Sequence, residues 1–179
     1  LTTLRSSADK LNGLLVRLGR YGTQGSDKVE PLALDECVAR VAAQYGRAYP
    51  ALRAECAPCV VEGQREGLEQ ALAHLVQNAI DASRDNAPVT LHVHEDGDYG
   101  IVEIADTGEG MSQEFIRSRL FKPFVSSKQG GFGIGAFEAR TLITMMRGRL
   151  DVESREGVGT RFFVRLPKPG AHDPIATTK

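Results

Sequence analysis

Several features that would define a protein class are scarce in this sequence. Its 179 residues include no tryptophan and three cysteines, and 22 basic against 23 acidic residues leave a net charge of -1. The balanced charge argues against nucleic acid or an anionic membrane surface as a partner, and three cysteines are too few for a disulfide framework. No apolar run approaches the roughly 18 residues of a membrane-spanning helix, and no signal-peptide pattern is present. We therefore expect a chain that buries one sizeable hydrophobic core.

Two of the cysteines form an isolated Cys56-Ala-Pro-Cys59 motif. A zinc site would need a second pair of ligands at a suitable spacing, and none is evident. A thioredoxin-like site would stand at the start of a helix, whereas this motif lies between two short strand-like runs. We therefore interpret these cysteines as ordinary side chains of a protein in a reducing cytoplasm.

The hydrophobic pattern divides the chain into segments. Leucines at helical spacing predict a helix over residues 1–21, and the polar stretch 23–28 is typical of a linker. Segment 29–167 is the expected globular domain, and the proline- and glycine-containing stretch 168–179 is expected to be a disordered tail. Because the chain starts in mid-helix and without methionine, we expect it to be a piece of a longer protein.

Apolar periodicity within the globular segment indicates its fold class. It predicts helices near residues 35–45, 64–83 and 134–148. The stretches "PVTLHVHED" and "YGIVEIADTG" predict one hairpin, "RLDVESREGVGTRFFVRLP" predicts another, and short strands are expected at "VEPLAL" and on both sides of Pro58. This arrangement predicts an α/β protein, a two-layer sandwich of helices and a mixed, mainly antiparallel sheet.

The predicted helix at 64–83 carries polar side chains along one edge. In "HLVQNAIDAS", the side chains of His74, Asn78 and Asp81 are about one turn apart and therefore lie on the same side of the helix. An amide oxygen on a rigid helix can bind Mg²⁺, which needs few protein ligands beside phosphate oxygens and water. Taken alone, such a residue is more often an ordinary surface asparagine.

Two glycine-containing stretches add candidate ligand contacts. In "EIADTGEGM" an apolar strand leads into Asp106, whose carboxylate can accept a hydrogen bond from an exocyclic amino group, and Gly108 and Gly110 allow the backbone to approach a flat ring. An ordinary Asp-Thr-Gly turn has the same pattern. In "KQGGFGIGAFEAR" glycines precede a helix, so that free backbone N–H groups can bind phosphate. The stretch matches neither the Rossmann fingerprint nor a P-loop.

In this order the stretches resemble the ATP-binding domain of sensor histidine kinases, which shares the Bergerat fold with gyrase-type topoisomerases and mismatch-repair ATPases. "HLVQNAIDAS" is similar to the N box and "LFKPFVSSK" to the phenylalanine box. "DTGEGM", "GGFGIG" and "GVGTRFFVRLP" are similar to the three glycine boxes. The resemblance covers about residues 29–167, implies a Bergerat-type sandwich, and implies that residues 1–22 are the end of a dimerisation and phosphoacceptor helix.

The resemblance also implies a site for ATP and Mg²⁺. Asn78 would be the metal ligand, Asp106 would bind the adenine amino group directly, and Thr160 would reach it through water. Phe121 and Phe124 would anchor a mobile lid on the core. The implied nucleotide-binding residues are His74, Asn78, Asp81, Asp106, Gly108, Gly110, Lys128, Gly131, Gly133, Ile134, Gly135 and Thr160.

The residue four positions before Asn78 separates two activities. Members of the superfamily that hydrolyse ATP carry a glutamate there, which activates water. This sequence has His74, as is common in the histidine-kinase branch. None of the four histidines starts an acceptor motif on a helix, so the resemblance implies that the phosphorylated histidine lies outside the chain and that the chain holds no catalytic residue beyond its ATP site.

The resemblance therefore implies a protein-histidine kinase domain of a two-component system. It would phosphorylate its own dimerisation and phosphoacceptor domain for relay to a response-regulator aspartate, in a homodimeric parent without nucleic-acid partners. The domain would be cytoplasmic, and an anchor of the parent in the bacterial inner membrane stays open. The alternatives are a self-sufficient ATPase clamp and a degenerate nucleotide-binding scaffold.

Two details qualify the resemblance. Many sensor kinases carry a basic residue where this chain has Asp81, and an acidic residue cannot contact phosphates favourably unless magnesium or water intervenes. "GIGAFEAR" is similar to the exosortase-associated sensor kinases in particular.

Overall fold

The computed structural model of the chain describes Gly13, Val16 and residues 28–125 and 133–171. Both Gly13 and Val16 are helical, but the rest of the predicted first helix, the linker up to residue 27 and most of the tail lie outside the described residues. The described helices are α2 (Leu34–Gly46), α3 (Arg65–Ala82), α4 (Gln113–Ser118) and α5 (Gly135–Met145). The described strands are β1 (Glu30–Ala33), β2 (Leu52–Cys56), β3 (Val60–Gly63), β4 (Val89–Asp96), β5 (Tyr99–Asp106), β6 (Arg149–Arg155) and β7 (Gly159–Pro167).

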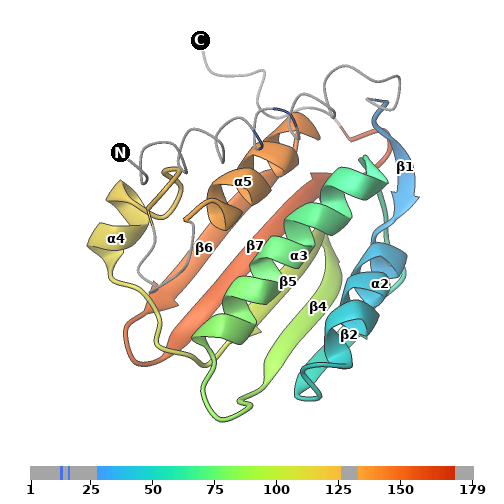
Figure 1. Cartoon of the computed structure of the whole chain (residues 1–179). Helices are drawn as coiled ribbons and strands as arrows, with labels where there is room; N and C mark the ends of the chain where they lie inside the picture. Colours follow the sequence, from blue (N-terminus) through green and yellow to red (C-terminus); the bar gives the residue numbers. More distant parts are fainter. Residues whose placement is uncertain (1–12, 14–15, 17–27, 126–132, 172–179) are drawn as a thin grey trace.

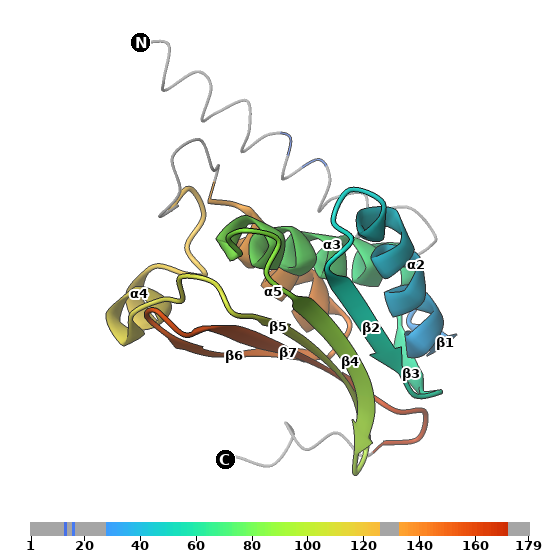
Figure 2. The ribbon, with the colours of Figure 1, turned by 90° about the horizontal axis from the view of Figure 1, so that it is seen from below.

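The fold has two layers. Five strands form a sheet in the order β2-β4-β5-β7-β6, in which β2 and β4 are parallel and the other neighbours are antiparallel. Helices α2, α3 and α5 cover one face of this sheet (Figures 1 and 2). A separate antiparallel pair joins β1 to β3. The predicted two-layer sandwich with a mixed, mainly antiparallel sheet is confirmed.

The sheet buries alternate residues, as the sequence pattern requires. In β4 the side chains of Val89, Leu91 and Val93 are buried, whereas Thr90 and His92 are exposed. Successive strand residues point to opposite faces, so the three apolar side chains pack under the helices while the polar ones face away from them. The register between β4 and β5 and that between β5 and β7 follow from this burial, because a slip of one residue would expose the apolar set.

The central helix of the covering layer is α3. It lies between α2 and α5 (Figure 1) and buries Leu68, Leu72, Leu75 and Val76 completely. Full burial of such a side chain stabilises the fold by about 1.5–3 kcal/mol. The helix is therefore held firmly against the sheet, and its opposite edge can carry polar residues without loss of the fold.

Two helices differ from the sequence prediction. Helix α4 was not predicted, because its six residues bury no side chain and give no apolar period. Its N-cap is Ser112, whose Oγ accepts a hydrogen bond from the Phe115 backbone N–H at 3.1 Å. Helix α5 ends at Met145, before the predicted end at Gly148, and Arg147 adopts a positive φ of 59° that a continuing helix does not allow.

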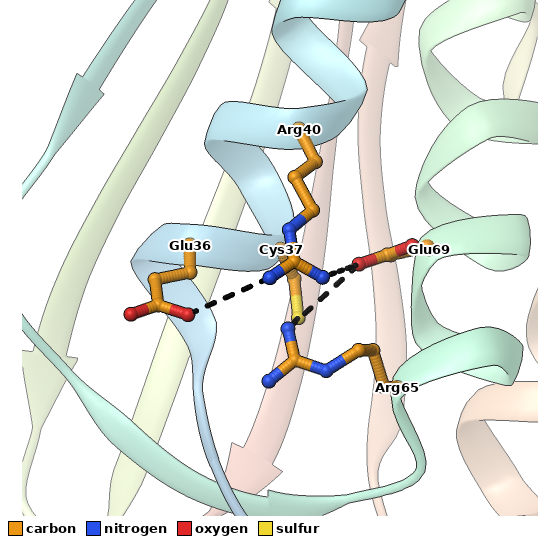
Figure 3. A network of polar contacts seen from close by, with 5 residues as sticks. All are labelled: Glu36, Cys37, Arg40, Arg65 and Glu69. Atoms are coloured by element: carbon orange, nitrogen blue, oxygen red, sulfur yellow. Dashed lines mark hydrogen bonds and ion pairs between the residues drawn. The ribbon is translucent and has the colours of Figure 1, made fainter.

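A polar network joins α2 to α3 on the surface (Figure 3). Arg40 Nη1 lies 3.3 Å from Glu69 Oε1, and Arg65 Nη1 lies 3.7 Å from the sulfur of Cys37. Exposed ion pairs of this kind contribute about 0–1 kcal/mol each, so the network adds little to the stability of the fold.

The cysteines behave as ordinary side chains. All three are free, and burial raises the pKa of the Cys37 thiol and that of the Cys59 thiol to about 11. Both thiols are therefore protonated near neutral pH. Because the thiolate is the reactive form of cysteine, neither side chain is expected to be reactive. Within the described part of the chain, no cluster of three or more His, Cys, Asp or Glu side chains could hold a metal ion.

Candidate functional site

A cavity of about 420 Å³ lies between α3 and α5 and extends to the end of β5 and the start of β7. Most of the residues implied as ligand contacts line it, although they are spread over the chain. Lys128 and Gly131 lie outside the described residues, and Gly108 does not line the cavity. The lining members of the implied set are His74, Asn78, Asp81, Asp106, Gly110, Gly133, Ile134, Gly135 and Thr160.

Asp106 and Thr160 form one end of the cavity. Asp106 is the last residue of β5, is 8% exposed, and stands directly opposite Thr160 on β7. Its Oδ1 accepts a hydrogen bond from the Gly108 backbone N–H at 2.8 Å, which fixes the carboxylate in the turn after the strand. A buried carboxylate in this position can accept a hydrogen bond from a ligand amino group.

The side chain of Ser154 makes three hydrogen-bond contacts at the Asp106 and Thr160 end of the cavity. No sequence pattern indicated this residue, because an isolated serine in a strand is not distinctive. Its hydroxyl donates to the Gly159 carbonyl at 2.9 Å, accepts from the Met111 backbone N–H at 2.8 Å, and lies 2.8 Å from the Thr160 hydroxyl. Since the Ser154 proton goes to Gly159, the Thr160 hydroxyl donates to Ser154. These contacts hold the loop after β5 against the β6–β7 hairpin.

The glycines of the loop after β5 are required by the protein's own backbone. A Cβ on Gly110 would overlap the Arg155 carbonyl, and one on Gly108 would overlap the Ala82 carbonyl at the end of α3. Gly110 also has a positive φ of 67°. Close approach to a flat ring is therefore not needed to explain either glycine, although Gly110 does line the cavity.

The other end of the cavity lies where α5 begins. A Cβ built on Gly135, the first residue of α5, would lie 3.5 Å from Nδ1 of His74 and 3.8 Å from Oδ1 of Asn78. The polar edge of α3 therefore faces the N-terminus of α5, where backbone N–H groups and the helix dipole favour an anion. Neighbouring Asp81 accepts a hydrogen bond from Gln77 Nε2 at 2.7 Å.

Glu138 is a cavity residue that was not among the predicted site residues. It belongs to α5, its side chain is 1% exposed, and its Oε2 lies 2.8 Å from Nε2 of His74. Its Oε1 accepts a hydrogen bond from Gln70 Nε2 at 2.6 Å. A signal was present in the sequence, because Glu138 precedes the buried Leu142 by four residues and so interrupts the apolar stripe of the helix.

The segment before α5 agrees only in part with the predicted lid anchors. Phe121 packs against the core, with the Arg140 guanidinium 4.8 Å from its ring centre. Phe124 is 40% exposed, so its predicted anchoring role is wrong. The Phe124 backbone N–H donates to the Gly133 carbonyl at 3.0 Å, which joins the two ends of the undescribed segment 126–132.

Replacing Gly135 by alanine is expected to weaken nucleotide binding about tenfold without loss of stability. The new methyl group would meet only ordinary van der Waals neighbours, and alanine favours a helix by about 1 kcal/mol over glycine. It would, however, project toward His74 and Asn78, where phosphates would lie. Thermal unfolding and calorimetric titration with ATP would measure the two effects.

Gly110→Ala is the contrasting variant. It is expected to lower the melting temperature, because its Cβ would overlap the backbone carbonyl of Arg155. Equal nucleotide binding by Gly135→Ala and wild type would contradict the placement of phosphate beside Gly135.

Comparison with known proteins shows the family of the chain. Residues 63–170 match the family described as "Histidine kinase-, DNA gyrase B-, and HSP90-like ATPase". The chain belongs to this family of ATP-binding domains, and it is of the sensor-histidine-kinase type.

Two curated relatives, a sensor histidine kinase and a sensor protein, are much longer than this chain. Sensor histidine kinase RcsC of Escherichia coli K12 is 37% identical over 123 residues, which cover 65% of this chain and 13% of RcsC. The C4-dicarboxylate transport sensor protein DctB of Rhizobium meliloti is 28% identical over 176 residues, which cover 94% of this chain and 28% of DctB. The chain thus spans a minor part of each relative.

Solved structures share the fold. The mycobacterial sensor histidine kinase MprB superposes with a TM-score of 0.69 at 24% identity, over 78% of this chain and 97% of that one. Full-length ShkA, solved in complex with AMPPNP, gives 0.71 at 24% identity, over 93% of this chain and 37% of that one. The architecture of α3, α5 and the five-stranded sheet is therefore that of a histidine kinase catalytic domain.

Proposed function

We propose that this domain binds Mg·ATP in the cavity and transfers the γ-phosphoryl group to a histidine on the dimerisation and phosphoacceptor domain of the same protein. The phosphoryl group would then pass to a response-regulator aspartate. The observation that carries this proposal is the arrangement of the cavity, which has a buried carboxylate at one end and a helix N-terminus facing Asn78 and His74 at the other. This arrangement suits an adenine nucleotide, because its exocyclic amino group can donate to a carboxylate and its phosphates are anionic.

The residues fit the groups that they would hold. Asp106 and Thr160 would bind the adenine amino group, directly and through water, and the backbone at Gly135 would bind phosphate. Asn78 offers a neutral amide oxygen beside that phosphate position, which suits a hard cation with few protein ligands. When bound, Mg²⁺ supplies charge neutralisation, and the protein's part is to hold the phosphates in place.

The remaining assignments belong to the same proposal. Residues 1–22 would be the end of the dimerisation helix, 29–167 the catalytic domain and 168–179 a tail. The parent would be a homodimer that works with a response regulator. Within the described residues, no helix is long and apolar enough to cross a membrane. An inner-membrane anchor of the parent and membership of the exosortase-associated subgroup stay predictions.

A chimera tests the kinase activity. DctB aligns with 94% of this chain, so the chain can replace the aligned part of DctB, and DctB would then supply the proposed phosphoacceptor histidine. We expect the chimera to incorporate label from γ-labelled ATP in a form that is stable in base and labile in acid, as phosphohistidine is. The chain alone should not retain label.

The matched control is a chimera whose acceptor histidine is replaced by glutamine, which should stay unlabelled. If the histidine-containing chimera binds ATP and dimerises but gains no label, the kinase proposal is wrong. The degenerate-scaffold alternative would gain support if wild-type chain failed to bind ATP at all.

A further inference from the structure

A buried carboxylate lies directly behind the imidazole of His74. Glu138 Oε2 is 2.8 Å from His74 Nε2, and Glu138 Oε1 accepts the 2.6 Å hydrogen bond from Gln70. Both carboxylate oxygens thus have polar contacts with α3, although Glu138 belongs to α5. Burial of a charge is unfavourable unless it is paired, so this contact fixes Glu138 and His74 relative to each other.

The contact also decides which imidazole nitrogen faces the cavity. A carboxylate oxygen 2.8 Å from Nε2 favours a proton on that nitrogen, because the negative charge would repel the lone pair of an unprotonated nitrogen. The other nitrogen, Nδ1, is on the side of Gly135 and Asn78, where α5 begins. In hydrolytic triads a carboxylate holds an imidazole in one tautomer and orientation in the same manner, and the second nitrogen acts as the base.

The alignment of the pair is imperfect. Glu138 lies off the direction of the Nε2–H bond, so the contact is a close polar approach and does not meet the geometry of a hydrogen bond. Catalytic hydrogen bonds are often poorly aligned before substrate binds and tighten in the substrate complex. Alignment of this pair requires a rotation of the imidazole ring or of the Glu138 carboxylate.

We propose that Glu138 positions His74 as a general base, which gives the domain a second activity, the slow hydrolysis of ATP. Nδ1 of His74 takes a proton from water while the water oxygen bonds to the γ-phosphorus. The bond from the γ-phosphorus to the bridging oxygen breaks, its electron pair stays on ADP, and phosphate leaves. The inference rests on the proposed function only in that the terminal phosphates lie beside Gly135. The sequence lacks a water-activating glutamate at position 74, and in this proposal α5 supplies the carboxylate instead.

Phosphate release by the 179-residue chain at saturating Mg·ATP tests this proposal. We expect sustained release above that of Asp106→Asn, in which the nucleotide contact is removed. Glu138→Gln is expected to lower kcat by about tenfold or more, with KM for ATP changed less than about threefold, because general-base catalysis contributes about 10²–10⁴-fold. His74→Ala should have the same effect, and the double variant should be no slower than His74→Ala. Glu69→Gln, a matched change on the side of α3 that faces α2 and away from the cavity, should leave release unchanged.

The ¹⁵N chemical shifts of the His74 side chain give a readout that does not depend on turnover. In the wild type they should show the proton on Nε2, and Glu138→Leu should move them toward a mixture of tautomers. Leucine also suits the buried position should glutamine unfold the chain. Release no faster than that of Asp106→Asn, or an unchanged kcat in a folded Glu138 variant, would overturn the proposal. Labelling of the chimera is a separate result, so a labelled chimera with no hydrolysis by the chain would leave the kinase proposal intact.

Discussion

Replacing Asp106 by asparagine is expected to weaken ATP binding by about a hundredfold, equivalent to roughly 2.7 kcal/mol. The side-chain carbonyl of the variant can still accept the hydrogen bond from Gly108, so the turn should survive. The amide NH₂ would then face the adenine amino group, and two donors would meet where a donor and an acceptor now pair. A buried polar group left without its partner costs about 1–3 kcal/mol, and here both groups lose one. Calorimetric titration with ATP measures the loss.

A nucleotide with a different base provides the control for Asp106→Asn. Inosine triphosphate carries a carbonyl where adenine carries its amino group, so the variant amide can donate to it. We expect the variant to lose less affinity for inosine triphosphate than for ATP, while its melting temperature stays within a few degrees of wild type. An ATP affinity within twofold of wild type would show that Asp106 does not contact the base.

The second large effect is expected from Asn78→Ala. The variant should lose the gain in ATP affinity that Mg²⁺ gives the wild type, and phosphohistidine formation in the chimera should fall about a hundredfold or more, because a bound metal supplies several kcal/mol of charge stabilisation. Alanine has a higher helix propensity than asparagine, so α3 should stay folded. Titrations with Mg²⁺ and with a chelator, followed by initial rates of labelling, measure the two effects.

Asn78→Asp is the control that separates loss of the metal ligand from a change in the shape of the side chain. Aspartate keeps an oxygen that can bind Mg²⁺, so this variant should retain a metal-dependent gain in affinity that Asn78→Ala lacks. If Asn78→Ala kept the wild-type response to Mg²⁺, the metal would have to be bound elsewhere in the cavity.

The two ends of the cavity make different demands on the fold. Asp106 is fixed by strand pairing, because it is the last residue of β5 and lies opposite Thr160. Gly135, Asn78 and His74 depend on the packing of α5 against α3. Substitutions that loosen α5 should therefore affect phosphate contacts before they affect the base contact.

The sequence by itself determined the polar edge of α3 and the described elements other than α4. Helical periodicity places His74, Asn78 and Asp81 on one side of any helix formed there, and alternation in β4 decides which of its residues are buried. These features depend only on residues a few positions apart. The order of the glycine-rich stretches then sufficed to predict the fold through its resemblance to a family.

Only the tertiary structure decided which distant residues meet. Glu138 lies against His74 because α5 packs on α3, and Ser154 joins the loop after β5 because the β6–β7 hairpin brings it there. Phe124, predicted to be an anchor, is exposed. A sequence period specifies which side of an element a residue occupies, but not the neighbour that this side will face, because that depends on how whole elements pack. In the sequence, Glu138 can be recognised only as a charged residue that interrupts an apolar stripe. That it contacts His74 is decided by the packing of α5 on α3.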